Sequence, residues 1–270
     1  MKKILLVISL CCLFPGLANA QFCFGNTGLL HLPTADMNAD KTFMFGAGTL
    51  APAATPDRWD YRTFNHYIDI TILPFLEISY NTTLFSGEDL KTRRGSKNHF
   101  DKWANQDRSF SAKIRIIKEG QFWKYMPQIV VGANDFLHTI GVEDMGTSKK
   151  VVGFWSSGNG YFGRFFAAAT EHFETGNFGT IGAHLAYMYN ERPEFLFSGI
   201  GAGADYRFHF ESDKLWAKAL NGLDLRAEYD SRAFNIGFNY AFWGDRINVI
   251  GEFYECKYFS CGLCCKFVLH

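Results

Sequence analysis

Charged residues at alternate positions are the first candidates for chemistry in this sequence. Arg226, Glu228 and Asp230 occur at every second position, close to Arg232 and Asn235. Paired carboxylates can carry out acid–base catalysis. A catalytic constellation also needs a base-orienting group and a substrate pocket, and the sequence indicates neither. We therefore predict that the protein is not an enzyme and that these charges pair along one strand and with its neighbour.

Cysteines near the C-terminal end are the second candidates. They are Cys256, Cys261, Cys264 and Cys265, and the Cys261–Cys264 spacing is typical of zinc sites. In an extended strand, however, Cys264 and Cys265 point to opposite faces, which argues against a four-thiolate cage. Export favours disulfides over free thiols, so a disulfide among Cys256, Cys261 and Cys264 stands open beside inert packing.

Other catalytic patterns are missing from the sequence. The 8 histidines form no His-Glu-x-x-His pair, and there is neither a Gly-x-Ser-x-Gly elbow nor a phosphate-binding loop. We predict no bound metal and no cofactor.

The first twenty residues have the pattern of a secretory signal peptide. Lys2 and Lys3 precede an almost unbroken apolar run from Ile4 to Phe14, and Leu17-Ala18-Asn19-Ala20 ends in the small-x-small pattern of a cleavage site. The run is shorter than the roughly 20 residues that a membrane-spanning helix needs. We predict that residues 1–20 are a signal peptide, cleaved after Ala20, and that the protein is exported.

The charge balance excludes one class of partner. The predicted mature chain keeps 25 Lys and Arg, the total of 27 less Lys2 and Lys3, against 27 Asp and Glu, so its net charge is −2. A nucleic-acid binder would need a basic face, so we predict no nucleic-acid partner. Aromatic residues make up 17% of the chain, with 28 Phe, and their even spread favours a surface that faces lipid.

Period-two alternation dominates the chain. From Ser109 to Ile116 the apolar residues take the even positions, and from Leu223 to Asp230 they take the odd ones, which separates two faces of a strand. Most such segments run about nine to eleven residues, the length of a tilted membrane-crossing strand, whereas soluble strands average about five or six. We predict twelve strands near residues 41–50, 66–73, 75–85, 108–117, 127–136, 160–170, 180–190, 198–210, 222–230, 233–242, 245–254 and 257–269.

These segments predict a barrel. No apolar stretch after residue 20 has the length of a membrane helix, and only helices and closed barrels satisfy every backbone group in lipid. Tight corners such as Leu73-Pro74-Phe75 and Trp243-Gly244-Asp245 contrast with long connections over 87–105 and 143–160, as in outer-membrane barrels. We predict an all-β fold, a single antiparallel transmembrane β-barrel of about 12 strands over residues 41–270, in the outer membrane of a Gram-negative bacterium.

The polar positions of these strands should line the lumen. An Arg or Lys that faces the bilayer midplane costs about 2–4 kcal/mol, so the charged residues must point inward. The lumen-facing candidates are Lys113, Arg115, Asp205, Arg207, Arg226, Glu228, Asp230, Arg246 and Glu252. Between Phe234 and Phe242 the apolar positions should face lipid, and Asn235, Gly237 and Asn239 should face the lumen.

A segment ahead of the first strand carries a family resemblance. Residues 25–37 read Gly-Asn-Thr-Gly-Leu-Leu-His-Leu-Pro-Thr-Ala-Asp-Met, and a glycine-rich aromatic stretch follows from Lys41 to Leu50. With Ala133 to Phe136, Gly160 to Phe166 and Leu223 to Gly237, the chain resembles YjbH-type proteins, which are outer-membrane β-barrels linked to exopolysaccharide production. Residues 21–40 are then an N-terminal segment that forms either a periplasmic turn or a small plug in the lumen.

The resemblance implies a function but no catalytic residues. It implies a structural or transport role in exopolysaccharide export or assembly, with outer-membrane lipid, polysaccharide and periplasmic export proteins as partners. The alternatives are a barrel enzyme that modifies outer-membrane lipid or glycan, and a narrow porin. About twelve strands with many inward side chains would leave a porin little open water, since wide porins use sixteen or eighteen strands.

Overall fold

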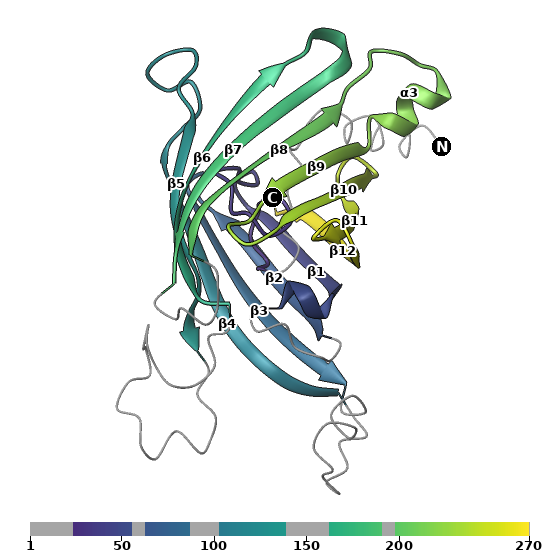
Figure 1. Cartoon of the computed structure of the whole chain (residues 1–270). Coiled ribbons are helices and arrows are strands. Elements are labelled where there is room, and N and C mark those ends of the chain that lie inside the picture. The colour runs from purple at the N-terminus through teal and green to yellow at the C-terminus, as the bar shows by residue number, and fades with distance from the viewer. Residues whose placement is uncertain (1–23, 56–62, 87–102, 139–161, 191–197, 270) are drawn as a thin grey trace, which may run out of the picture.

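The protein is a closed β-barrel. The computed structural model describes residues 24–55, 63–86, 103–138, 162–190 and 198–269, and Figure 1 shows their strands wrapped into one barrel. Each strand pairs antiparallel with its neighbour in the chain, and β1 closes the barrel against β12. The structure thus confirms the predicted single antiparallel transmembrane barrel of twelve strands. The predicted signal peptide lies outside the described residues.

The strand bounds follow the alternating segments of the sequence. The strands are β1 (Thr42–Leu50), β2 (Thr63–Ile72), β3 (Leu76–Ser86), β4 (Trp103–Ile117), β5 (Gln128–His138), β6 (Arg164–Glu174), β7 (Gly179–Tyr189), β8 (Gly199–Phe208), β9 (Leu223–Tyr229), β10 (Phe234–Phe242), β11 (Ile247–Tyr254) and β12 (Tyr258–Val268). The sixth strand differs most from the prediction, since it begins and ends four residues later than expected. It continues to Glu174 rather than stopping at Thr170, because residues 171–174 pair with residues 180–183 of β7.

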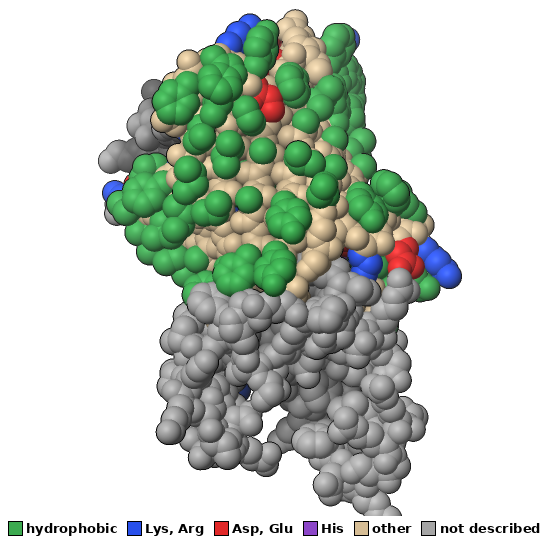
Figure 2. All heavy atoms as spheres, turned by 60° about the vertical axis from the view of Figure 1, so that its left-hand side comes forward, with side chains coloured by type: hydrophobic (Ala, Val, Ile, Leu, Met, Phe, Trp, Pro, Cys, Tyr) green, Lys and Arg blue, Asp and Glu red, His purple; other side chains and the backbone are tan. Residues whose placement is uncertain are grey.

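Burial alternates along the strands as the barrel requires. In β10, Phe234 and Ile236 are exposed on the outer wall, whereas Asn235 and Asn239 are buried in the lumen. Figure 2 shows hydrophobic side chains spread over the outer wall, with charged side chains toward its ends. The exposed apolar wall includes Phe45, Ile68, Phe110, Ile114, Val131, Leu185, Ile200, Leu225, Phe253, Phe259 and Leu263. This polar-in, apolar-out order suits a barrel surrounded by hydrocarbon.

The two ends of the barrel differ in their connections. Residues 87–102 and 139–161 join β3 to β4 and β5 to β6, and we call this end the long-loop end. The opposite end, which we call the short-turn end, carries the tight turns at residues 73–75 and 243–246. It also carries two longer connections, 118–127 and 209–222. The second contains the short helix α3 (Leu215–Leu220), which the sequence did not predict. In bacterial outer-membrane barrels, the end with the short turns is the periplasmic end.

Among the described residues, no helix combines the length and the apolar character needed to cross a membrane.

A charge on the outer wall should be costly. Leu185 lies in the middle of β7 and is 55% exposed on the outer face. We expect Leu185→Arg to lower the free energy of unfolding in lipid vesicles by about 2–4 kcal/mol, because the guanidinium would face hydrocarbon. Denaturant titration of the refolded protein measures this, and Leu185→Ala is the control. Equal stability of the Arg and Ala variants would contradict the placement of this wall in the bilayer.

Candidate functional site

The lumen is occupied by the chain's own N-terminal segment. Every residue from Phe24 to Asn38 is buried, and Figure 1 shows this purple segment inside the barrel. We call residues 24–38 the plug. Its last residues lie at the short-turn end, where the chain continues into β1 at Thr42. The plug turns back on itself through the Gly28–Pro33 bridge and the Leu29 N–Leu32 O hydrogen bond of 3.1 Å. Of the two structures predicted for this segment, a turn or a plug, the structure contains the plug.

Glycine at position 25 is required by the fit of the plug against the wall. Gly25 has φ of +79°, and a Cβ placed there would lie 2.8 Å from Cβ of Tyr67. An L-residue would be strained by its backbone and would meet β2. The glycine of the N-terminal sequence thus serves close packing in the lumen.

Glu228 holds the tip of the plug. Its carboxylate accepts hydrogen bonds from the backbone N–H groups of Leu30 at 2.9 Å, His31 at 2.7 Å and Leu32 at 3.1 Å. The side-chain amide of Asn235 donates a fourth at 3.2 Å. Glu228 is 3% exposed, so these donors replace the water that a carboxylate would otherwise bind. The tip is fixed by one wall carboxylate that satisfies three consecutive backbone groups.

Lys113 and Glu77 hold the two arms of the plug. The Lys113 ammonium donates to the carbonyl of Thr27 at 2.8 Å and to that of Asp36 at 2.6 Å, and also to the Thr27 hydroxyl. Glu77 accepts from Thr27 N at 2.5 Å and from its hydroxyl at 2.7 Å. Lys113 Nζ lies 3.6 Å from Glu77 Oε2, with both side chains fully buried. This ion pair therefore ties the ascending and descending arms together.

Two arginines bind carbonyls near the tip. Arg226 donates to Leu29 O at 3.0 Å and pairs with Asp224 at 2.8 Å. Arg164 donates to His31 O at 2.8 Å, and its guanidinium lies 3.8 Å from the ring centre of Phe24. Between these arginines and Glu228, the tip has both its N–H and its C=O groups bound by wall side chains.

Histidines and carboxylates surround the base of the plug. His172 lies 2.9 Å from Glu119 and 3.4 Å from Asp36. His184 lies 2.6 Å from Asp205 and 3.9 Å from Asp36, so the contacts of the cluster extend from the turn after β4 to β8.

A threonine, a histidine and an aspartate form a relay in this cluster. Ala35 N donates to the Thr170 hydroxyl at 2.9 Å, that hydroxyl lies 2.9 Å from His184 Nδ1, and His184 Nε2 lies 2.6 Å from Asp205. The order resembles a nucleophile–base–acid array. Here the Thr170 oxygen already accepts the plug's N–H, so the relay contributes to holding the plug.

A second segment covers the plug at the long-loop end. Arg232 donates to Thr55 O at 3.1 Å, to Ala53 O, and to the Tyr254 hydroxyl at 2.6 Å. Ala51 N donates to the Ser260 hydroxyl at 3.0 Å. The short 3-10 helix η1 (Pro52–Ala54) is thereby held over the tip, where the His31 ring lies 5.3 Å from that of Tyr254.

Most of the predicted lumen residues lie inside the barrel. Lys113, Asp205, Arg226, Glu228, Asp230 and Glu252 are buried there, with Glu252 2.7 Å from His31. Arg115 and Arg207 are half-buried and bind Gln128 at 3.2 Å and Asp205 at 3.5 Å. Arg246 differs from the prediction. It is exposed, because β10 ends at Phe242 and β11 begins at Ile247, which leaves residue 246 in the turn.

The predicted pairing along β9 is also different in the structure. Arg226 forms its ion pair with Asp224 and not with Glu228. Asp230 accepts from Arg232 N at 2.9 Å and Ala233 N at 2.7 Å, so it closes the turn into β10. The plug supplies the hydrogen-bond donors of the Glu228 carboxylate, and this explains why Glu228 does not pair with Arg226.

The cysteines do not form the disulfide left open by the sequence. Cys256, Cys261, Cys264 and Cys265 are all free thiols. Cys261 is exposed on the outer wall of β12, whereas Cys264 is buried on the lumen side. Side chains on opposite faces of one strand cannot reach each other. Within the part of the chain that the structure describes, no group of three or more His, Cys, Asp or Glu is arranged to hold a metal.

Several plug contacts could not be predicted from the sequence. Thr27, His31 and Asp36 bind the wall, yet nothing in their spacing set them apart from a surface turn. The available signal was polar residues placed between apolar ones in a segment that does not alternate. Their partners lie between 50 and 221 positions away along the chain, from Glu77 to Glu252.

Fold and site together define a class: a membrane-spanning β-barrel whose lumen is plugged by its own N-terminal segment. The sequence model of the YjbH family, described as exopolysaccharide biosynthesis protein YbjH, matches residues 20–247. The chain belongs to this family. The comparison with curated proteins gave no significant match.

Solved structures similar to this chain include barrels of the outer membrane. Outer membrane phospholipase A from Escherichia coli shares 10% identity, with 85% of this chain and 96% of that chain covered and a TM-score of 0.35. The N-terminal β-barrel domain of Pseudomonas aeruginosa OprF shares 10% identity over 84% and 98%, with a TM-score of 0.23. A mutant of Rh. blastica porin shares 9% identity over 84% and 99%, with a TM-score of 0.29.

Proposed function

We propose that this protein is a non-enzymatic outer-membrane component of exopolysaccharide export or assembly, and that its barrel acts in the plugged form, in a structural role. Membership of the exopolysaccharide biosynthesis family supports the process. The observation that carries the structural role is the plug, whose residues 24–38 are all buried in the lumen and bound by buried wall charges. Polysaccharide and periplasmic export proteins are the proposed partners.

The plug weighs against the narrow porin. Its arms are tied by the fully buried Lys113–Glu77 pair and its tip by Glu228. Both charges belong to the wall, so opening would leave this pair intact but would break its hydrogen bonds to Thr27 and Asp36 and those of Glu228 to the tip. Each hydrogen bond to a charged group contributes about 1.5–3 kcal/mol, so spontaneous opening would be infrequent. The enzyme alternative is disfavoured because the triad-like relay through Thr170, found among the described residues, has its hydroxyl oxygen engaged by the plug.

A gated conduit is the second candidate function. It is favoured by the polar nature of the anchors, which join the plug's backbone to wall side chains such as Glu228 and Arg164. Water can replace each of these hydrogen bonds at a net cost of about 0.5–1.5 kcal/mol, or about 1.5–3 kcal/mol where a charge takes part. A partner that engaged the plug could therefore displace it without unfolding the barrel.

A covalent lock distinguishes the two functions. A Cβ at Gly203 of β8 would lie 2.5 Å from Cδ1 of Leu29 in the plug, so the two Cβ atoms are at most about 5 Å apart, near the range of about 3.5–4.5 Å that disulfides adopt. We expect Leu29→Cys/Gly203→Cys, in a Cys23→Ser background, to form a disulfide and to keep exopolysaccharide secretion near the wild-type level, because the plugged form is the working form. Secreted polysaccharide is measured in cells that lack the native gene.

The controls are the two single-cysteine variants, with and without reductant. Secretion that is lost in the locked protein and restored by reductant would replace the structural role with the gated conduit. Normal secretion in cells that lack the gene altogether would overturn both functions.

A further inference from the structure

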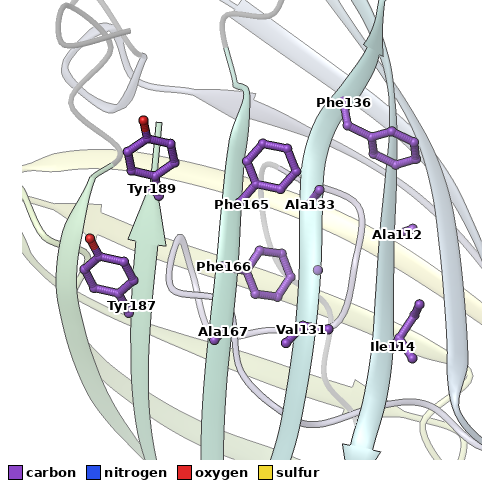
Figure 3. A pocket seen from close by; sticks show the side chains of 11 residues that line it. Ala112, Ile114, Val131, Ala133, Phe136, Phe165, Phe166, Ala167, Tyr187 and Tyr189 are labelled. Carbon is purple, nitrogen blue, oxygen red and sulfur yellow. The ribbon is translucent and has the colours of Figure 1, made fainter. Parts of the chain in front are cut away.

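An apolar groove crosses the outer wall over β4, β5, β6 and β7. Figure 3 shows its lining, and its volume is about 560 Å³. Small side chains at Ala112, Ala133 and Ala167 lie along it. Ala133 and Ala112 lie on β5 and β4 to one side of the Phe165 ring, and Ala167 lies on β6 beside Tyr187 of β7. The rings of Phe136, Phe165, Tyr187 and Tyr189 border these small side chains, so this region is a hollow between aromatic rings.

The hollow has a cause in the strand pairing. The register of β4 against β5 shifts between Phe110 and Ala112, and Asp135 of β5 has φ of +50°. A β-bulge bends the strand and changes the direction of the side chains that follow it. Ala112 therefore pairs with Ala133, two small residues face to face, and the next large side chain, Phe136, lies beyond the bulge.

The position of the groove identifies its surroundings. Ile114 and Val131, which are 42% and 41% exposed, line it and are part of the apolar wall that contacts membrane hydrocarbon. At Tyr189, which is the last residue of β7, the groove approaches the long-loop end of the barrel. That end belongs to the outer leaflet. In Figure 3 the hydroxyls of Tyr187 and Tyr189 point toward this end of β7, as expected of aromatic residues at a membrane interface.

We propose that this groove is a binding site for a saturated acyl chain of an outer-leaflet glycolipid, lipid A. An apolar hollow in a wall surrounded by hydrocarbon is filled by acyl chains, and the outer leaflet supplies the saturated chains of lipid A. An acyl chain that lies between Phe165 and Tyr187 packs closely against both rings and therefore gains dispersion energy. The glycan headgroup then lies beside the two tyrosine hydroxyls. The proposal does not depend on the role of the plug.

The test fills the groove from within. Ala167→Phe places a ring in the hollow, and Ala204→Phe makes the same change on the outer face of β8, where Ala204 pairs with Ala183 and Ala227 outside the groove. Native mass spectrometry of the protein in detergent, titrated with hexa-acylated lipid A, measures the one-to-one adduct. We expect Ala167→Phe to weaken binding by about tenfold or more, equal to about 1.4 kcal/mol, and Ala204→Phe to leave it unchanged.

Three outcomes overturn the proposal. One is an unchanged lipid A adduct in Ala167→Phe, provided that the variant keeps heat-modifiable migration on a gel. Another is equal competition by a diacyl phosphatidylethanolamine, which would make the groove a general lipid contact. The third is a dimer of the wild-type protein that Ala167→Phe dissociates, since a second copy of the chain would then cover the groove.

Discussion

Replacing Glu228 by alanine is expected to lower the free energy of unfolding of the barrel by about 3–5 kcal/mol. The change removes the acceptor of three buried N–H groups, from Leu30, His31 and Leu32, and each buried donor left without a partner costs about 1–3 kcal/mol. Glu228→Gln keeps one acceptor oxygen and should be less destabilising. Denaturant unfolding of the refolded protein, followed by heat-modifiable migration, measures both.

The matched control is Glu174→Gln at the end of β6. Glu174 is exposed and accepts only the Thr180 hydroxyl at 3.0 Å among the contacts resolved for it, so its change should stay within about 0.5 kcal/mol. Any loss of exopolysaccharide in Glu228→Gln should be proportional to the loss of folded protein. If Glu228→Gln folds to the wild-type level and still abolishes secretion, Glu228 acts on a ligand or substrate, and the structural role must be abandoned.

The Lys113–Glu77 pair should show strong energetic coupling. Lys113→Met leaves the carboxylate of Glu77 buried beside Thr27 without its cation, and we expect a loss of about 3–5 kcal/mol. Adding Glu77→Gln should recover part of that loss, because the uncompensated charge disappears. The four proteins of this double-mutant cycle are compared by denaturant unfolding.

Lys118→Met serves as the control for the lysine change. Lys118 is exposed in the turn after β4, so this substitution should have little effect on unfolding. Additive effects of the Lys113 and Glu77 substitutions would show that these two cross-strand neighbours are not energetically coupled.

The barrel could be predicted from the sequence because its signal is local. A strand that faces lipid on one side and a polar lumen on the other must alternate with period two, and the burial of β7 does so from Ile181 to Tyr189. The predicted segment 233–242 differs from β10 by one residue, since the turn ahead of it is closed by Asp230. Arg246 was misplaced because alternation does not show where a strand gives way to a turn.

The contents of the lumen were decided by the tertiary structure. Most of the plug's anchors are its own backbone N–H and C=O groups, and every residue type except proline carries both, so the sequence has no mark that distinguishes a bound backbone group from a solvated one. Glu228 meets Leu30 across 198 positions of the chain. Only closure of the barrel brings them together.

This difference between local signals and contacts of distant residues applies to the whole protein. Alternation, strand length and the apolar outer face were determined by the sequence, because each depends on neighbouring residues and on the solvent that each face meets. The partners of Arg226, Glu228 and Asp230, the free thiols of β12 and the position of residues 24–38 were determined only in three dimensions. Those contacts join residues that approach one another only when β1 pairs with β12 and encloses the plug.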